Sequence, residues 1–244
     1  HRNLLDAIPH GGCIRMFGDA NQLQPIEQNK RLAKEDSSFL KMLDKHPSTR
    51  LTTIHRQAED SSIIAAGAKI VVGNMPTRSE DFNLKITSKP VDAVLDFVTD
   101  QLHEGVDYGS LDNQIITPTR VGWVGSDALN GAVQSMLQPA TQKNTYLERN
   151  KWVDNQRFLV YVGDKVLCTK NNYGLEVFNG ETGIILEITN TDSIVVDFGD
   201  KTTEIPISQA VEGRGGEVYY INPQKDIDLA YLITTHKSQG SEYE

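Results

Sequence analysis

The first 140 residues alternate between apolar stripes at helical spacing and short apolar runs. Apolar residues that recur every three or four positions over 61–72 and 91–102 predict two amphipathic helices, and a third helix is predicted to start at Ser126, its expected N-cap. The run at 13–17 predicts a short buried strand, and a second short strand is predicted at 114–116. Strands that alternate with helices in this way indicate an α/β domain with a parallel sheet.

A different pattern begins near residue 151. Helical periodicity gives way to short β runs, and pairs such as Gly-Asp, Asn-Asn and Asn-Gly separate them as turn signals. The pattern predicts five strands, at 158–162, 165–169, 183–188, 193–198 and 202–207. Five short strands with tight turns are typical of a small β-barrel.

The last residues return to the first pattern. An apolar run over 229–233 predicts a buried strand, and the polar residues that follow it would lie at its C-terminal edge, where open α/β sheets bind ligands. At this edge Gly240 can bring the backbone close to a phosphate or sugar, and Glu242 can accept a hydrogen bond from a ribose hydroxyl. We therefore expect 225–244 to close the larger sheet.

The chain has 244 residues, of which 38% are hydrophobic and 23% charged, as in an ordinary soluble globular protein with a sizeable core. The net charge of −9 excludes a global basic surface, so any nucleic-acid binding would need a local groove. Two distant cysteines, Cys13 and Cys168, and six histidines without ligand spacing indicate a reducing compartment and no structural metal.

No apolar stretch approaches the roughly 20 residues that a membrane span needs, and no signal peptide is visible. We expect no membrane partner. Because the chain starts with His1 and stops where a helix should begin, we expect it to be a piece of a longer protein.

Polar residues that could act on a phosphate follow two predicted strands. After 13–17, Asp19 and Gln22 place a carboxylate and an amide where they could hold a metal-bound water or sense a terminal phosphate. The alternative is an Asx turn, because Gly-Asp and Asn favour turns on their own. In 51–57, a short strand that runs into a polar corner, Arg56 offers a permanent charge and a planar fork that matches phosphate oxygens; an ordinary surface arginine is the alternative.

The strand at 114–116 also leads into a polar loop. The hydroxyls of Thr117 and Thr119 and the head of Arg120, next to a helix N-terminus, could grip a sugar-phosphate backbone without reading bases. For each of them the alternative is a loop that only caps the sheet. Trp123 in the same loop could stack on a base or pack against the protein.

Several segments resemble motifs of superfamily 1 helicases. The segment His236-Lys-Ser-Gln-Gly-Ser-Glu242 resembles motif V, in a wording closest to the RecD/Dda-like branch. The segment Gly18-Asp-Ala-Asn-Gln-Leu-Gln-Pro25 resembles motif III, with Gln24 in place of a proline. The Arg-Gln pair at 56–57 resembles part of motif IV.

The resemblance extends to the β-rich part. The segments Gly163-Asp-Lys-Val166 and Phe178-Asn-Gly-Glu-Thr-Gly183 are similar to the SH3-like insertion that helicases of this branch carry. The resemblance implies an α/β fold, in which a small SH3-like β-barrel is inserted into a RecA-like parallel-sheet domain. On this resemblance, residues 1–50 would end a first RecA-like domain and 51–150 would start a second. Residues 151–224 would form the barrel, and 225–244 the closing strand with motif V.

Helicases of this kind bind ATP and Mg²⁺ between two RecA-like domains and single-stranded DNA across both. On this resemblance Asp19 and Gln22 would report the state of the γ-phosphate or Mg²⁺, and Arg56 would offset the charge that develops during phosphoryl transfer. The implied nucleotide contacts are Gln22, Arg56, Gly240 and Glu242. The implied contacts to the DNA backbone are Thr117, Thr119, Arg120, Thr235, His236 and Ser238.

The chain contains no Gly-x-x-x-x-Gly-Lys-Ser/Thr phosphate loop and no Asp-Glu pair, which precede these motifs in the family. We therefore expect negligible ATP hydrolysis by the chain alone. The resemblance implies that the intact parent is an ATP-dependent 5′-to-3′ DNA helicase of replication, repair or recombination, in the cytoplasm of a bacterium or a phage-infected cell.

Two other functions remain open. The chain could be a non-catalytic binding module in which the barrel recruits a protein partner, or the parent could act on RNA. Binding to oligo-dT that falls steeply with salt favours the motor, whereas salt-insensitive capture of a protein favours the module.

Overall fold

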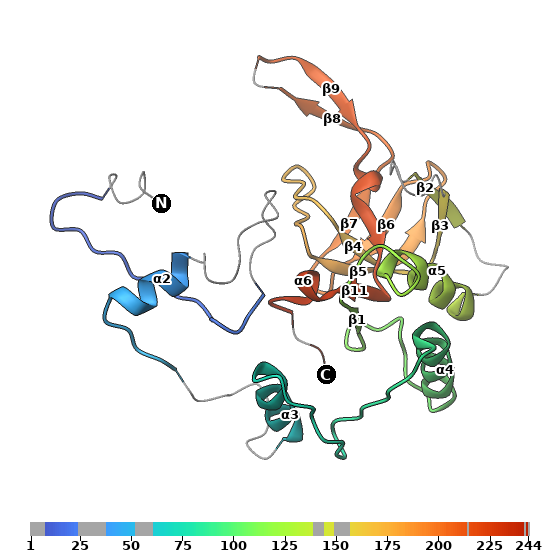
Figure 1. Cartoon of the computed structure of the whole chain (residues 1–244). Helices are drawn as coiled ribbons and strands as arrows, with labels where there is room; N and C mark the ends of the chain where they lie inside the picture. Colours follow the sequence, from blue (N-terminus) through green and yellow to red (C-terminus); the bar gives the residue numbers. More distant parts are fainter. Residues whose placement is uncertain are drawn as a thin grey trace. The chain divides into compact units, whose positions relative to one another are not determined.

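The structure is a computed structural model that describes residues 8–23, 38–51, 61–138, 144–148, 157–213, 215–241 and 243 (Figure 1). The chain divides into two compact units, residues 1–86 and 87–244, which we call the first and second units.

The first unit contains α2 (Ser38–Lys45) and α3 (Ser62–Val71). Helix α3 forms where the apolar stripe predicts it, and the Ser61 side chain caps it by accepting a hydrogen bond from the backbone N–H of Ile63 at 3.3 Å. Asp81 accepts from the Ser61 hydroxyl at 2.8 Å and from the Ser62 N–H at 2.9 Å, so a loop after the helix reinforces its start. The hydrogen bonds from Ser62 and Ser61 hold the pKa of Asp81 below its usual range.

The buried strand predicted at 13–17 is wrong. These residues form no strand, and Ile14, Met16 and Phe17 are 41%, 48% and 91% exposed. A strand needs neighbours to satisfy its backbone N–H and C=O groups, and the described residues of the first unit include no strand to pair with it. In the predicted strand at 51–57, all residues after Leu51 lie outside the described residues.

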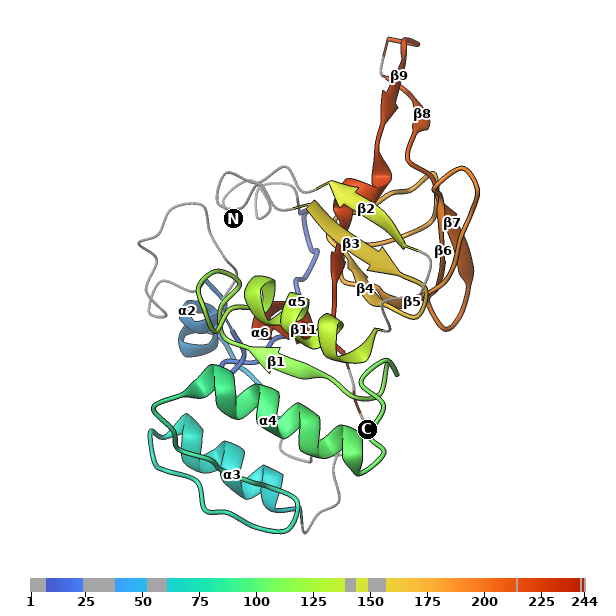
Figure 2. The same ribbon diagram turned by 90° about the vertical axis from the view of Figure 1, so that its right-hand side faces the viewer.

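The α/β layer of the second unit is built on two parallel strands (Figure 2). Its elements are α4 (Pro90–His103), β1 (Ile115–Thr117), α5 (Ser126–Leu137), β11 (Leu232–Thr234) and α6 (Thr235–Ser238). Val98 of α4 and Leu129 and Val133 of α5 are buried in its core. The predicted α/β class is therefore confirmed, with one correction: Gly125 is the N-cap of α5, and Ser126 is its first helical residue.

The rest of the second unit is antiparallel. A five-stranded sheet has the order β10-β4-β5-β6-β7, formed by Ile227–Leu229, Lys165–Cys168, Thr182–Ile188, Ile194–Asp197 and Thr202–Ile205. Two hairpins accompany it, β2-β3 (Asn144–Glu148 and Arg157–Tyr161) and β8-β9 (Gln209–Glu212 and Val218–Ile221). All five predicted strands are present, while β2, β8 and β9 were not predicted. In both views the β8-β9 hairpin extends away from the sheet (Figures 1 and 2).

The strand predicted over 229–233 is two strands. β10 runs antiparallel to β4, and after Ala230 and Tyr231 the chain continues as β11, parallel to β1. Both intervening residues are buried, at 0% and 1% exposed. One continuous segment therefore belongs to both sheets.

Candidate nucleic-acid and nucleotide site

The two parallel strands of the second unit end side by side. Thr117 of β1 lies opposite Thr234 of β11, so the loops that follow both strands leave from the same edge. The hydroxyl of Thr235 donates to the carbonyl oxygen of Thr117 at 3.3 Å, which ties the start of α6 to the end of β1. We call this place the carboxyl edge.

Thr117 supports the carboxyl edge from inside. It is 5% exposed, and its hydroxyl donates to the carbonyl oxygen of Val124 at 2.9 Å, across the loop that follows β1. Thr119 in the same loop is exposed, and Trp123 is 67% exposed, so the loop presents both to solvent.

The loop is folded tightly on the start of α5. The backbone N–H of Asp127 donates to the carbonyl oxygen of Arg120 at 3.1 Å, and that of Ser126 donates to the carbonyl oxygen of Thr119 at 3.1 Å. A Cβ atom on Gly125 would lie 2.4 Å from the Arg120 oxygen. Only glycine fits there, and this close approach fixes the place of Arg120.

Arg120 belongs to a cluster of four charged side chains. Its Nε lies 3.2 Å from Oδ1 of Asp127, and its Nη2 lies 3.4 Å from Oδ2 of Asp228. Nζ of Lys237, on α6, lies 3.9 Å from the same Oδ2. Two cations and two carboxylates thus meet at the carboxyl edge. The sequence singled out Arg120 but missed Asp228, which lies 108 residues away in the chain.

The residues after β11 form a short polar turn. His236 is exposed, and the hydroxyl of Ser238 donates to the carbonyl oxygen of Thr235 at 2.9 Å. Gly240 is exposed with φ +88°, a left-handed conformation that favours glycine, and open space surrounds the position of its missing Cβ. Glu242 lies outside the described residues.

The residues predicted to sense the nucleotide lie elsewhere in the chain. Asp19 and Gln22 are exposed in the first unit. The backbone N–H of Asn21 donates to Oδ1 of Asp19 at 2.8 Å, so Asp19 forms the Asx turn that the sequence left open as an alternative. Arg56 lies outside the described residues. The nucleotide roles of these residues, and of Gly240, stay predictions, as do the DNA-contact roles at the carboxyl edge.

A buried carboxylate joins the antiparallel sheet to the α/β layer. Asp164, in the turn between β3 and β4, is 0% exposed. Its Oδ1 accepts from the hydroxyl of Tyr231 at 2.8 Å, and its Oδ2 accepts from Nε2 of Gln134 at 2.5 Å and from the N–H of Tyr161 at 2.8 Å. Burial raises the pKa of Asp164, although these hydrogen bonds oppose the shift.

The neighbouring Lys165 makes a second buried link. It is also 0% exposed, and its Nζ donates to the carbonyl oxygens of Ser110 and Asn113, both at 2.9 Å, in the loop before β1. Burial lowers the pKa of Lys165 from its ordinary 10.5 to about 8, partly offset by the charges of Asp112 and Asp107. The Gly-Asp-Lys-Val segment therefore anchors the antiparallel sheet to the α/β layer.

The free energy of unfolding of the protein is expected to rise with pH between about 8 and 10.5, relative to that of a Lys165→Met variant. In this window the unfolded chain still holds the lysine proton that the folded chain has lost, so raising the pH favours the folded state. The gain is at most roughly 2 to 3 kcal/mol, and no such slope is expected below about pH 8.

Urea unfolding of both proteins at pH 7, 9 and 10 measures this difference. A Lys89→Met variant, which removes an exposed lysine of the same unit, is the matched control. Its free energy of unfolding should differ from that of wild type by the same amount at all three pH values. A constant difference for Lys165→Met as well would contradict the prediction.

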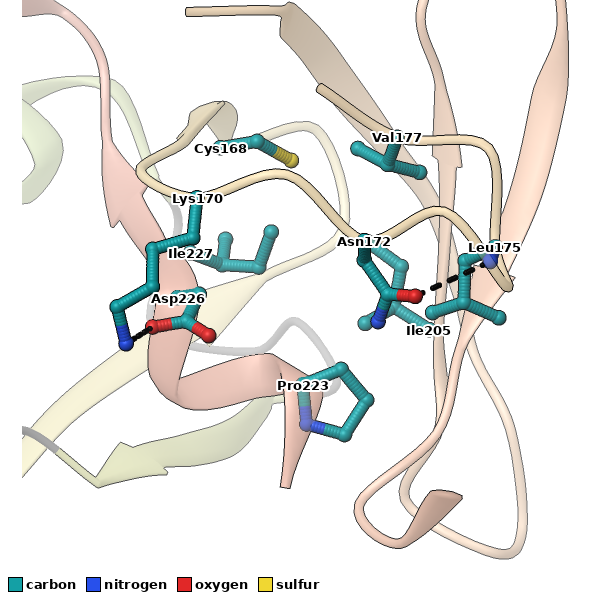
Figure 3. A pocket seen from close by; sticks show the side chains of 9 residues that line it. All are labelled: Cys168, Lys170, Asn172, Leu175, Val177, Ile205, Pro223, Asp226 and Ile227. Carbon is teal, nitrogen blue, oxygen red and sulfur yellow. Dashed lines mark hydrogen bonds and ion pairs between the residues drawn. The ribbon is translucent and has the colours of Figure 1, made fainter. Parts of the chain in front are cut away.

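A small pocket lies at one end of the antiparallel sheet (Figure 3). Its lining residues are Cys168, Lys170, Asn172, Leu175, Val177, Ile205, Pro223, Asp226 and Ile227. Lys170 Nζ pairs with Asp226 Oδ1 at 2.7 Å, and Asn172 Oδ1 accepts from the N–H of Leu175 at 3.1 Å. Burial raises the pKa of the Cys168 thiol to about 12, which makes it a poor nucleophile.

Neither a metal cluster nor a membrane-spanning helix occurs among the described residues. They hold no group of three or more His, Cys, Asp or Glu side chains that could hold a metal ion. Nor does any helix in that part of the chain have the length and apolar character to cross a membrane.

The fold is that of an α/β protein in which an antiparallel sheet is inserted between two parallel strands, and open α/β sheets bind ligands at the carboxyl ends of such strands. Residues 129–198 match the family described as the SH3 domain of ATP-dependent RecD-like DNA helicases. The predicted resemblance of this part of the chain to the SH3-like insertion of RecD-like helicases is thereby confirmed.

Curated relatives are similar along nearly the whole chain. The ATP-dependent RecD2 DNA helicase of Deinococcus radiodurans is 29% identical over 99% of this chain, and the RecBCD enzyme subunit RecD of Mycobacterium tuberculosis is 26% identical over 98%. This chain spans 29% and 40% of the lengths of these relatives. The solved structure of a Bacteroides Pif1 helicase with ADP-AlF3 and single-stranded DNA is similar over 92% of this chain and 53% of that one, with 19% identity and a TM-score of 0.48.

Proposed function

We propose that the parent protein is an ATP-dependent DNA helicase that moves 5′ to 3′ along single-stranded DNA and unwinds duplex. In it, residues 1–50 end the first RecA-like domain, 51–150 and 225–244 belong to the second, and 151–224 form the SH3-like insertion. The observation that carries the proposal is the similarity, over 99% of this chain, to a relative named as an ATP-dependent DNA helicase.

The carboxyl edge is the proposed contact to the DNA backbone. Thr119, Thr235 and His236 are exposed there and carry hydroxyl and imidazole groups that can bind sugar or phosphate. Arg120 adds a planar cation, and Thr117 and Ser238 hold the two turns in shape through their hydroxyls. Contacts of this kind are independent of base sequence, which suits a motor that moves over any base. The exposed ring of Trp123 suits stacking on a base.

ATP and Mg²⁺ are the proposed cofactors. Asp19 is exposed, and a carboxylate that accepts one backbone hydrogen bond keeps further capacity to accept from a metal-bound water. Gln22 and Arg56 would contact the terminal phosphate, and Gly240 and Glu242 would contact ribose or phosphate. Bound Mg²⁺ would neutralise charge on the phosphates during their transfer.

The parent protein is expected to show an ATPase activity that single-stranded DNA stimulates. Its affinity for oligo-dT should fall about tenfold or more between 50 and 200 mM salt, as for roughly three phosphate contacts to a single strand. Steady-state ATPase assays and fluorescence anisotropy in a salt series measure both. An ATPase rate that DNA leaves unchanged would refute the helicase, and salt-insensitive binding of a protein would favour the non-catalytic module.

A further inference from the structure

We propose that Asp228 is a positioning residue that holds Arg120 and Lys237 together as one phosphate-binding pair at the carboxyl edge. The proposal rests on the proposed function, because it concerns how that edge grips DNA.

The geometry around Asp228 carries the proposal. A single oxygen, Oδ2, lies 3.4 Å from Nη2 of Arg120 and 3.9 Å from Nζ of Lys237. Arg120 comes from the loop after β1 and Lys237 from the turn after β11, so the two cations belong to the two loops of the edge. Two cations that both contact one oxygen would repel each other if that oxygen carried no negative charge.

The exposed fractions of the three side chains show which of them face solvent. The Asp228 side chain is 9% exposed, whereas those of Arg120 and Lys237 are 36% and 29% exposed. Asp228 is the middle residue of β10, where it pairs with Leu167 of β4, so its backbone is fixed by the sheet. An anion that arrives from solvent therefore meets the cations first. Asp228 acts as their support and not as a competitor for the same face.

Asp127, the other carboxylate of the cluster, also contacts Arg120. Its Oδ1 lies 3.2 Å from Nε of Arg120, while Asp228 contacts Nη2 of the same guanidinium. Two carboxylates at two nitrogens fix the plane of the guanidinium, which matters because its fork binds phosphate in that plane. Asp228 is the carboxylate that both cations share.

Asp228 also connects the antiparallel sheet to the carboxyl edge. β10 belongs to the antiparallel sheet, yet its central side chain orders the cations at the end of the parallel strands. A strand of the antiparallel sheet thus contributes a residue to the proposed DNA-binding edge.

An Asp228→Asn variant tests this proposal by whether it strengthens or weakens the binding of DNA. Removing a negative charge near DNA would by itself strengthen binding. Positioning predicts the opposite: a three- to tenfold weaker affinity for oligo-dT by anisotropy, and a DNA concentration for half-maximal ATPase that is raised by the same factor. The rate at saturating DNA should stay within twofold of wild type, because Asp228 would act on DNA only through the two cations. The assays use the full-length parent protein, with its thermal melting as a check of folding.

An Asp96→Asn variant is the matched control, since it removes the same charge from an exposed position on α4 and should leave the affinity unchanged or slightly higher. In a second background, Arg120→Gln with Lys237→Gln, adding Asp228→Asn should have no further effect on affinity. Equal or tighter DNA binding by Asp228→Asn, or an effect that persists in that background, would overturn the proposal. A wild-type protein that binds no oligo-dT would overturn the proposed function as well, before any variant is compared.

Discussion

Replacing Asp164 by alanine is expected to lower the free energy of unfolding by about 3 to 5 kcal/mol, because it leaves several buried donors without an acceptor. The hydroxyl of Tyr231, the amide of Gln134 and the backbone N–H of Tyr161 all donate to this carboxylate, from 2.5 to 2.8 Å. Tyr231 and Gln134 are 1% and 8% exposed, so their donors would have to open the junction between the antiparallel sheet and the α/β layer to reach water. Urea unfolding at constant pH measures the change.

Asp197→Ala is the matched control for this variant. Its carboxylate accepts a hydrogen bond from Gly199 at 2.8 Å in an exposed turn of the same sheet. Water can replace this bond, so we expect a loss below about 1 kcal/mol. A similarly small loss for Asp164→Ala would show that the junction tolerates unpaired donors, contrary to the prediction.

Replacing Asn130 by alanine is expected to destabilise the second unit by about 2 to 4 kcal/mol. Asn130 is 3% exposed on α5, and its amide is bonded to the backbone on both sides of Tyr231. Nδ2 donates to the carbonyl oxygens of Leu229 at 3.1 Å and Leu232 at 2.8 Å, and Oδ1 accepts from the N–H of Leu232 at 2.9 Å. Alanine leaves these backbone groups buried and unpaired.

Amide hydrogen exchange adds a local test of the same variant. Exchange at Leu232 should accelerate more than exchange in the β5-β6 pair, which Asn130 does not touch. Ser135→Ala on the same helix, where an exposed hydroxyl is bonded to Gly131, should change stability by no more than about 0.5 kcal/mol. Unchanged exchange at Leu232 would mean that other contacts hold β11 in place.

Elements with a clear period could be predicted from the sequence. The stripes over 61–72 and 91–102 became α3 and α4 with ends shifted by at most a few residues, because a helix buries a face that recurs every 3.6 positions. The turn pairs likewise located the strands of the antiparallel sheet. Strand β9 was not predicted, because its four residues are all exposed and its run Val-Tyr-Tyr-Ile lacks the alternation of apolar and polar residues that indicates a strand.

Two other errors have one cause. The apolar run at 13–17 forms no strand, and the run over 229–233 is divided between two sheets. Apolar character indicates that a segment prefers burial, but the choice of partner strand depends on the rest of the fold. A single sequence does not contain the pairing.

The candidate site shows the same limit. Polar residues after apolar runs located the carboxyl edge, since parallel strands bring their ends together. Asp228 was hidden because it lies within an apolar-flanked strand, and its tie to Arg120 spans most of the second unit. Asp164 and Lys165 stood in a predicted turn and strand that resembled the insertion, but their burial depends on α5 and on the loop before β1.

The connection of Ala230 and Tyr231 between β10 and β11 has a mechanical consequence. A hinge needs residues whose φ and ψ can change, and these two are enclosed by the core, with Tyr231 bonded to Asp164. A change in the angle between the antiparallel sheet and β11 at this connection would therefore have to break core contacts and the Tyr231–Asp164 hydrogen bond. Movement of that sheet is expected to be passed on to α6, which directly follows β11.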